Sequence, residues 1–195
     1  VSYNTLADLH YIKNPILCTD GQRLIATSDF DRTLWIWNST EPAVGQAPDV
    51  AINLKANNLF VRDNAVFDGK LVLAGQQNVA IWNNIPTAAT GPDLIFTNHI
   101  GTAEFEYLNA VAYDSAFFYL GERSGKIWLW EQLPANGNDN PDLEIVLPYA
   151  PLSSLHSDGE YLTATIQSGQ PYIYIFKVAE LQNGNLSPWK IITRD

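Results

Sequence analysis

The hydrophobic pattern of the chain is a series of short apolar runs separated by turns rich in Gly, Pro, Asp and Asn. Short runs bounded by turn residues are typical of β-strands rather than helices. Four of these runs carry aromatic residues: Leu34–Trp37, Val79–Trp82, Ile127–Trp130 and Ile173–Phe176. Their last residues are 45, 48 and 46 positions apart. A nearly fixed period of this size indicates an internal repeat.

Two further markers keep the same period and order. An Asp-Gly or Asp-Ser pair precedes each aromatic run, and Asp-Gly between apolar runs predicts a hairpin turn. The Asp residues of these pairs are Asp20, Asp68, Asp114 and Asp158, spaced 48, 46 and 44. A Pro-Asp pair follows the aromatic run in three copies, with its Asp at Asp49, Asp93 and Asp142. The fourth copy has Ser187-Pro188-Trp189 instead. The chain therefore consists of four copies of one unit.

Each unit divides into four strands. The first ends at the Asp turn, as in Ala110–Tyr113, and the second follows the turn, as in Leu71–Ala74. The third is the aromatic run, and the fourth follows the Pro-Asp pair, as in Leu143–Val146. The third strand is apolar on both faces, whereas a strand with one wet face would alternate. We therefore expect these sheets to stack face to face.

Four-stranded meanders of roughly 40 to 50 residues that stack around an axis are the blades of a β-propeller. We predict an all-β fold in which residues 1–195 form a single β-propeller domain of four-stranded antiparallel blades. The blades are expected at about residues 5–52, 59–96, 105–147 and 150–193. A linear β-solenoid is the structural alternative, but its coils are usually shorter than this repeat.

The way in which the ring is completed stays open. The chain could form a closed four-blade ring, half of an eight-blade ring completed by a second copy, or part of a larger propeller. The chain lacks Met and begins at Val1, so we expect a processed form or an excised piece. An open arc would expose apolar blade faces, and large apolar patches mark interaction surfaces.

The connection after the aromatic run carries the most specific motif. It contains Ile36-Trp37-Asn38 and Pro48-Asp49-Val50, and it recurs as Ile81-Trp82-Asn83-Asn84-Ile85-Pro86 with Pro92-Asp93-Leu94. This motif resembles repeats of bacterial β-propellers of the NHL and YVTN kind, including secreted proteins. It resembles WD40 repeats less, because the residue after Trp is Asn or Glu rather than Asp. The resemblance implies an extracytoplasmic propeller from a bacterium or archaeon, and it implies no particular activity.

The charge of the chain narrows the range of partners. The net charge is −10 and the pI is about 4.6. We expect no nucleic-acid partner, because that function requires a basic face. No apolar run approaches the roughly 18 residues of a membrane span, so we expect no membrane insertion. The single cysteine, Cys18, cannot form a disulfide within the chain and is expected to be a buried, inert thiol.

Polar residues precede the first strand of each unit, where a propeller would have its channel mouth. These candidate ligand-binding residues are Asn14, Asn64, Asn109 and Ser153. At similar positions in successive blades they would form a ring able to hold a cation, a water molecule or the hydroxyls of a sugar. The alternative is that they only cap turns. The three histidines fall at different phases of the repeat, so we expect no zinc or iron site.

No nucleophile elbow, phosphate loop or Cys-x-x-Cys motif is present in the sequence. We therefore expect a non-catalytic binding or assembly module without a cofactor. Its partner would be a protein, including another copy of the chain, or a glycan. One alternative is a propeller enzyme of the lactonase or sugar-dehydrogenase type with a channel calcium, for which the ring of Asn14, Asn64, Asn109 and Ser153 is the only support. Separately, Glu104 and Glu106 lie near His99 in the sequence, and an acid with a nearby His could serve as a general base. Another is a structural subunit that assembles through blade faces.

Overall fold

The computed structural model describes residues 15–28, 30–167 and 172–193. Four antiparallel sheets of four strands follow one another along the chain, each in simple meander order. The first blade is β1 (Pro15–Thr19), β2 (Leu24–Ser28), β3 (Thr33–Trp37) and β4 (Val50–Asn53), and the second is β5 (Val61–Phe67), β6 (Lys70–Gly75), β7 (Asn78–Trp82) and β8 (Leu94–Thr97). The third is β11 (Leu108–Tyr113), β12 (Phe118–Glu122), β13 (Lys126–Trp130) and β14 (Leu143–Val146), and the fourth is β15 (Leu152–Ser157), β16 (Tyr161–Ile166), β17 (Tyr172–Lys177) and β18 (Lys190–Thr193). The predicted β-propeller of four-stranded blades is confirmed.

Three small elements occur that the repeat does not predict, two of them between blades and one within the fourth blade. A 3-10 turn, Lys55–Asn57, lies between the first two blades. A hairpin of β9 (His99–Ile100) and β10 (Ala103–Glu104) lies between the second and third. The helix α1 (Val178–Gln182) follows β17 and buries Val178 and Leu181 in the core of the fourth blade. None of the described helices is long and apolar enough to cross a membrane.

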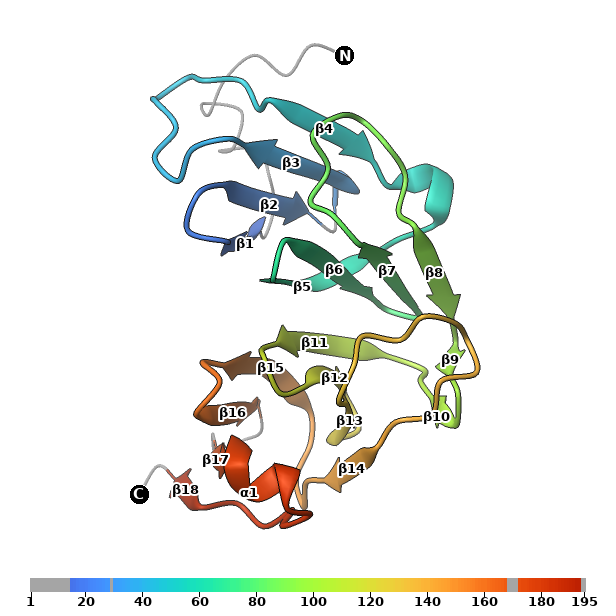
Figure 1. Cartoon of the computed structure of the whole chain (residues 1–195), viewed down its shortest axis with the longest axis vertical. Coiled ribbons are helices and arrows are strands. Elements are labelled where there is room, and N and C mark those ends of the chain that lie inside the picture. The colour runs from blue at the N-terminus through green and yellow to red at the C-terminus, as the bar shows by residue number, and fades with distance from the viewer. Residues whose placement is uncertain (1–14, 29, 168–171, 194–195) are drawn as a thin grey trace.

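Figure 1 shows the four blades arranged side by side in an open arc. We label the strands of each blade A to D outward, so β1, β5, β11 and β15 are the A strands at the inner side of the arc. Successive A strands pack on one another, from β1 through β5 and β11 to β15. Within the described residues, β1 and β15 show no comparable packing against each other. Half of an eight-blade ring and part of a larger propeller both remain predictions for how the arc is completed.

The hydrophobic core consists of the layers between adjacent blades. The first layer joins residues such as Ile36 to Trp82, the second joins Ile81 to Trp130, and the third joins Leu129 to Phe176. Strands β3 and β7 are buried along their whole length, as their two apolar faces predict. The outward residues of β17 are half-buried, because no described blade packs on that face.

The repeated Trp and Pro-Asp markers are structural. In three blades the Asp carboxylate accepts a hydrogen bond from the backbone N–H just after strand C, at 2.7, 2.8 and 2.7 Å. The Trp at the end of the same strand donates its indole N–H to a carbonyl oxygen inside the C–D loop. The Asp residues are Asp49, Asp93 and Asp142, and the Trp residues are Trp37, Trp82 and Trp130. The fourth blade has neither group, and α1 takes the place of this loop.

Candidate binding sites at the blade junctions

The structure describes three of the four predicted channel-mouth residues, and Asn14 lies outside the described residues. Each of the last three A strands contains a β-bulge near its start, between Val61 and Asp63, between Leu108 and Ala110, and between Leu152 and Ser154. The bulged residues are Arg62, Asn109 and Ser153. Asn109 and Ser153 therefore occupy equivalent positions, but Asn64 lies two residues further along its strand. The predicted ring is not at one level, and Arg62 stands where the prediction placed an Asn.

The side chains of these three residues are engaged in holding strands together. Asn64 donates its amide N–H groups to the Ile16 carbonyl (3.2 Å) and to Thr27 Oγ1 (3.0 Å) of the first blade. Asn109 donates to the Leu152 carbonyl of the fourth blade at 2.6 Å. Ser153 Oγ lies 2.8 Å from Thr165 Oγ1 within its own sheet. Whether any of these residues also binds a ligand stays a prediction.

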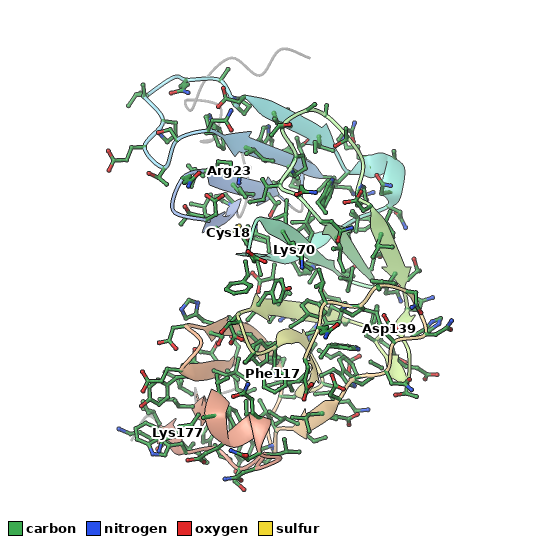
Figure 2. All side chains as sticks on the ribbon, in the orientation of Figure 1. Cys18, Arg23, Lys70, Phe117, Asp139 and Lys177 are labelled. Atoms are coloured by element: carbon green, nitrogen blue, oxygen red, sulfur yellow. The ribbon has the colours of Figure 1, made fainter. Side chains whose placement is uncertain are left out.

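A groove lies in the middle of the arc, between the four A strands. We call it the central groove. Its volume is about 380 Å³, and it is lined by Leu17–Thr19 of β1, Asp63–Val66 of β5, Val111–Tyr113 of β11 and Leu155–Ser157 of β15. Figure 2 shows Cys18 on this inner side of the first blade. Cys18 is half-buried rather than fully buried, and burial, together with the charges of Asp63 and Asp20, raises the pKa of its thiol to about 12. It is therefore a protonated, weakly nucleophilic thiol.

Asp63 lines the central groove, and the pKa of its carboxyl group is shifted from the ordinary value. Burial raises the pKa of its carboxyl from 3.8 to about 6, although two hydrogen bonds act in the opposite direction. The Val111 N–H donates to Oδ2 at 2.9 Å, and the Asn64 N–H donates to Oδ1 at 2.9 Å. Because Val111 belongs to β11, the Asp63 carboxylate joins the A strands of the second and third blades.

The D–A and B–C loops share one end of the blades, which we call the loop face. Arginine and aromatic side chains are in contact there at two blade junctions. The guanidinium carbon of Arg32 lies 3.3 Å from the centre of the Phe60 ring. Those of Arg62 and Arg123 lie 5.2 and 5.3 Å from the centre of the Tyr107 ring. These distances permit cation–π attraction.

The two aromatic residues occupy equivalent places in the repeat. Phe60 directly precedes β5, and Tyr107 directly precedes β11. The third junction has a different aromatic contact, in which Tyr149 of the D–A loop stacks on Tyr172 at the start of β17, with ring centres 4.5 Å apart. Tyr149 is 48% exposed. The loop face thus carries an aromatic site at each described junction between blades.

A cavity of about 420 Å³ adjoins Tyr107 on the loop face. It is lined by Glu106, Tyr107, Glu122–Ser124 and Ala150–Pro151. Glu122 is buried, and its carboxylate accepts hydrogen bonds from the Glu106 N–H (2.8 Å) and from Ser124 Oγ. These bonds hold the B–C loop of the third blade against the D–A loop, and the Arg123 side chain is left exposed at the rim.

Charges are distributed unequally between the two ends of the blades. The loop face carries the bases Arg32, Lys55, Arg62, Arg123 and Lys126, together with acids that include Asp31, Glu106 and Glu122. The A–B turns and C–D loops at the opposite end carry most of the acids, which include Asp20, Glu41, Asp49, Asp68, Asp93, Glu131, Asp142, Asp158 and Glu160. An acidic partner is therefore repelled least by the loop face.

Metal ligands do not gather in the described part of the chain. No group of three or more His, Cys, Asp or Glu side chains lies close enough together there to hold a metal ion. In the polar turn at residues 136–140, the Asp139 carboxylate accepts hydrogen bonds from the N–H groups of Ala135 and Asn136. Figure 2 shows Asp139 beside the β9–β10 hairpin, whose Gly101 N–H donates to the Gly137 carbonyl at 2.8 Å.

The fold defines the class of protein as a β-propeller with four-stranded blades. No protein-family model matches the chain, and no curated protein sequence matches it. Its fold matches 930 solved chains, so the architecture is too common to indicate one function. One match, in the "Crystal Structure of Mitotic Checkpoint Complex", is a WD40 propeller with a TM-score of 0.61 and 14% identity.

That alignment covers 91% of this chain and 50% of the matched chain, so this chain spans about half the length of that structure. At 14% identity the likeness shows the fold alone. The propeller part of the sequence prediction is confirmed. The match gives no support to the NHL or YVTN subtype.

Sequence reasoning missed the aromatic sites of the loop face. Phe60 and Tyr107 are 47 residues apart, close to the repeat period, and both stand directly before an A strand. Arg32 and Arg123 follow strand B in their blades. An alignment of the four units could therefore have found the aromatic position, but not which arginine contacts which ring.

Proposed function

We propose that the chain is a non-catalytic protein-binding module that recognises its partner through the loop face. The observation that carries this proposal is the set of Arg–aromatic contacts at the blade junctions. Arg, Tyr and Phe are enriched in protein interfaces, and Tyr and Arg in their energetic hot spots. Arg123 is exposed beside the half-buried Tyr107, so a cationic side chain and an aromatic ring meet at one place.

The charge distribution favours an acidic protein surface as the partner. The opposite end of the blades is acidic and would repel such a partner, whereas the loop face would repel it less. The matched propeller gives modest support, because its title describes a protein complex. Glycan binding and self-association are outcomes of the same test rather than separate proposals.

The proposal is tested first by site-specific crosslinking. A photoreactive residue replaces Ser124 on the loop face, and the matched control carries it at Val44, which is 97% exposed in a C–D loop at the opposite end. Proteins captured only from Ser124 are then purified. Their affinity is measured with the wild type and with the Tyr107→Ala and Arg123→Ala variants.

Each of the two variants is expected to weaken binding at least about tenfold, which corresponds to about 1.4 kcal/mol. Val44→Ser should leave the affinity unchanged. The proposal fails if the purified partner binds both variants as tightly as the wild type. It also fails if a glycan array or sedimentation velocity shows that only a glycan, or only another copy of the chain, occupies the loop face.

A further inference from the structure

The central groove has acceptors on its walls, and the exposed His156 is the basic side chain among its described lining residues. Among its described lining residues there is no Lys or Arg. The Asp63 carboxylate uses two of its roughly four acceptor positions for backbone N–H groups. A half-buried carboxylate that lacks a cationic partner is costly to keep ionised. The groove therefore favours a ligand that brings positive charge.

Asn64 gives a second and independent sign of a missing hydrogen-bond donor. It is 7% exposed, and its Oδ1 is buried without a hydrogen-bond partner, while both hydrogens of its Nδ2 are used. Buried acceptors in folded proteins almost always have a donor. Asp63 and Asn64 are neighbours on β5 and both line the groove, but the Asp63 carboxylate bonds toward β11 of the third blade and the Asn64 amide toward the first blade.

Apolar residues line much of the groove, beside the polar Thr19, His156 and Ser157. Leu17 of β1 is 57% exposed, and Val66 and Leu155 line the walls contributed by β5 and β15. A hydrated metal ion would gain nothing from these side chains. An alkyl chain would bury apolar area against them, at about 25 cal/mol per Å². The combination fits a cationic group carried on a short alkyl chain.

We propose that the central groove binds an alkylammonium or alkylguanidinium group, with the cation at the Asp63 carboxylate and the chain along Leu17 and Leu155. The same chemistry occurs in a free small amine or guanidine and in the Lys or Arg side chain of a protein. This site is distinct from the loop face and does not depend on the function proposed for that face.

The test is an NMR titration of the ¹⁵N-labelled chain. The probes are n-butylguanidinium, n-butylammonium and n-butylurea, the last being a neutral analogue of the first. The reporters are the backbone amides of Val111 and Asn64, which donate to the Asp63 carboxylate. We expect saturable shifts of these amides with the two cations, and affinity at least tenfold weaker for butylurea.

Two variants separate charge from apolar contact. Asp63→Asn, with folding verified from its own amide spectrum, should weaken cation binding at least tenfold. Leu17→Ser changes an exposed residue and should weaken it by a few-fold without affecting the fold. Asp158→Asn, a change of an exposed acid in an A–B turn, is the matched control and should have no effect.

The proposal is overturned if the cations and butylurea shift the same amides equally, if none of them shifts those amides, or if Asp63→Asn binds as the wild type does. A blocked Gly-Arg-Gly peptide distinguishes the two sources. Binding tenfold tighter than butylguanidinium supports a protein side chain as the ligand. Weaker binding than butylguanidinium supports a free small molecule.

Discussion

Replacing Asp63 by Asn should change how the stability of the protein depends on pH. Burial raises the pKa of this carboxyl to about 6 in the folded chain, against 3.8 without it. The folded state therefore holds the proton more tightly than the unfolded state. The resulting stabilisation is fully present below about pH 3.8 and is lost as the pH rises through about 6. At about 1.4 kcal/mol per pKa unit, the loss amounts to about 3 kcal/mol.

Other acids act in a different pH range, so the effect of Asp63 can be isolated. Burial alone would raise the pKa of Asp20, but the N–H groups of Gln22 and Arg23 and the Arg23 guanidinium lower it. Hydrogen bonds from the N–H groups of Tyr161 and Glu160 lower that of Asp158. These two groups stabilise the fold above pH 3.8 and lose that effect as the pH falls. Between about pH 4.5 and 7 their contributions are nearly constant.

The assay is urea denaturation followed by tryptophan fluorescence at half-unit steps of pH. The wild type should lose about 2 kcal/mol of unfolding free energy between pH 4.5 and 7 relative to Asp63→Asn. Asp158→Asn should keep the wild-type slope. The slope is the readout, because an Asn at position 63 also disturbs the bonds to Val111 and Asn64. Equal slopes for the wild type and Asp63→Asn would refute a raised pKa at this site.

Three further predictions concern the scaffold and are measured by the same denaturation assay. Asp93→Ala removes the carboxylate that accepts the Asn83 N–H at 2.8 Å, and should cost about 1.5 to 3 kcal/mol. Gly101→Ala introduces a Cβ 2.6 Å from the Asn140 Cα at a φ of +58°, so it should cost more than about 1 kcal/mol and raise amide exchange in the β9–β10 hairpin. Leu152→Ala empties a fully buried position and should cost about 2 to 5 kcal/mol. An effect below about 0.5 kcal/mol in any of the three would contradict the contact on which it rests.

The fold could be predicted from the sequence because its determinants are local. The carboxylates of Asp49, Asp93 and Asp142 bond to a backbone N–H only 10 or 11 residues earlier in the chain. Each marker therefore forms a hydrogen bond within its own C–D loop, and this loop recurs in every unit that carries the marker. In the fourth unit, where the marker is absent, α1 forms in place of this loop.

The candidate site was harder to predict because its determinants lie on different blades. Arg62 is equivalent to Asn109 only because of a bulge in each A strand, and the sequence does not reveal where a bulge falls. The titration of Asp63 depends on its burial and on the N–H of Val111, 48 residues away. Likewise, the Asn64 amide finds its partners on the first blade. Position in the repeat predicted that polar residues lie near the channel, but not their partners.

Both proposed sites lie at junctions between blades, so binding and the packing of blades should be coupled. Asp63 of the second blade accepts from Val111 of the third, and the Leu152 N–H of the fourth donates to the Arg123 carbonyl of the third. A cation held at Asp63 keeps that carboxylate ionised and in place, so it should lower the rate at which β5 and β11 separate. We expect butylguanidinium at ten times its dissociation constant to slow hydrogen exchange of the Val111 amide about tenfold, the limit for a ligand that binds only the closed junction. The Asp142 N–H, which bonds to Leu129 within the third blade, should exchange at its original rate. Equal slowing of both amides would mean that the ligand stabilises the whole fold rather than the junction.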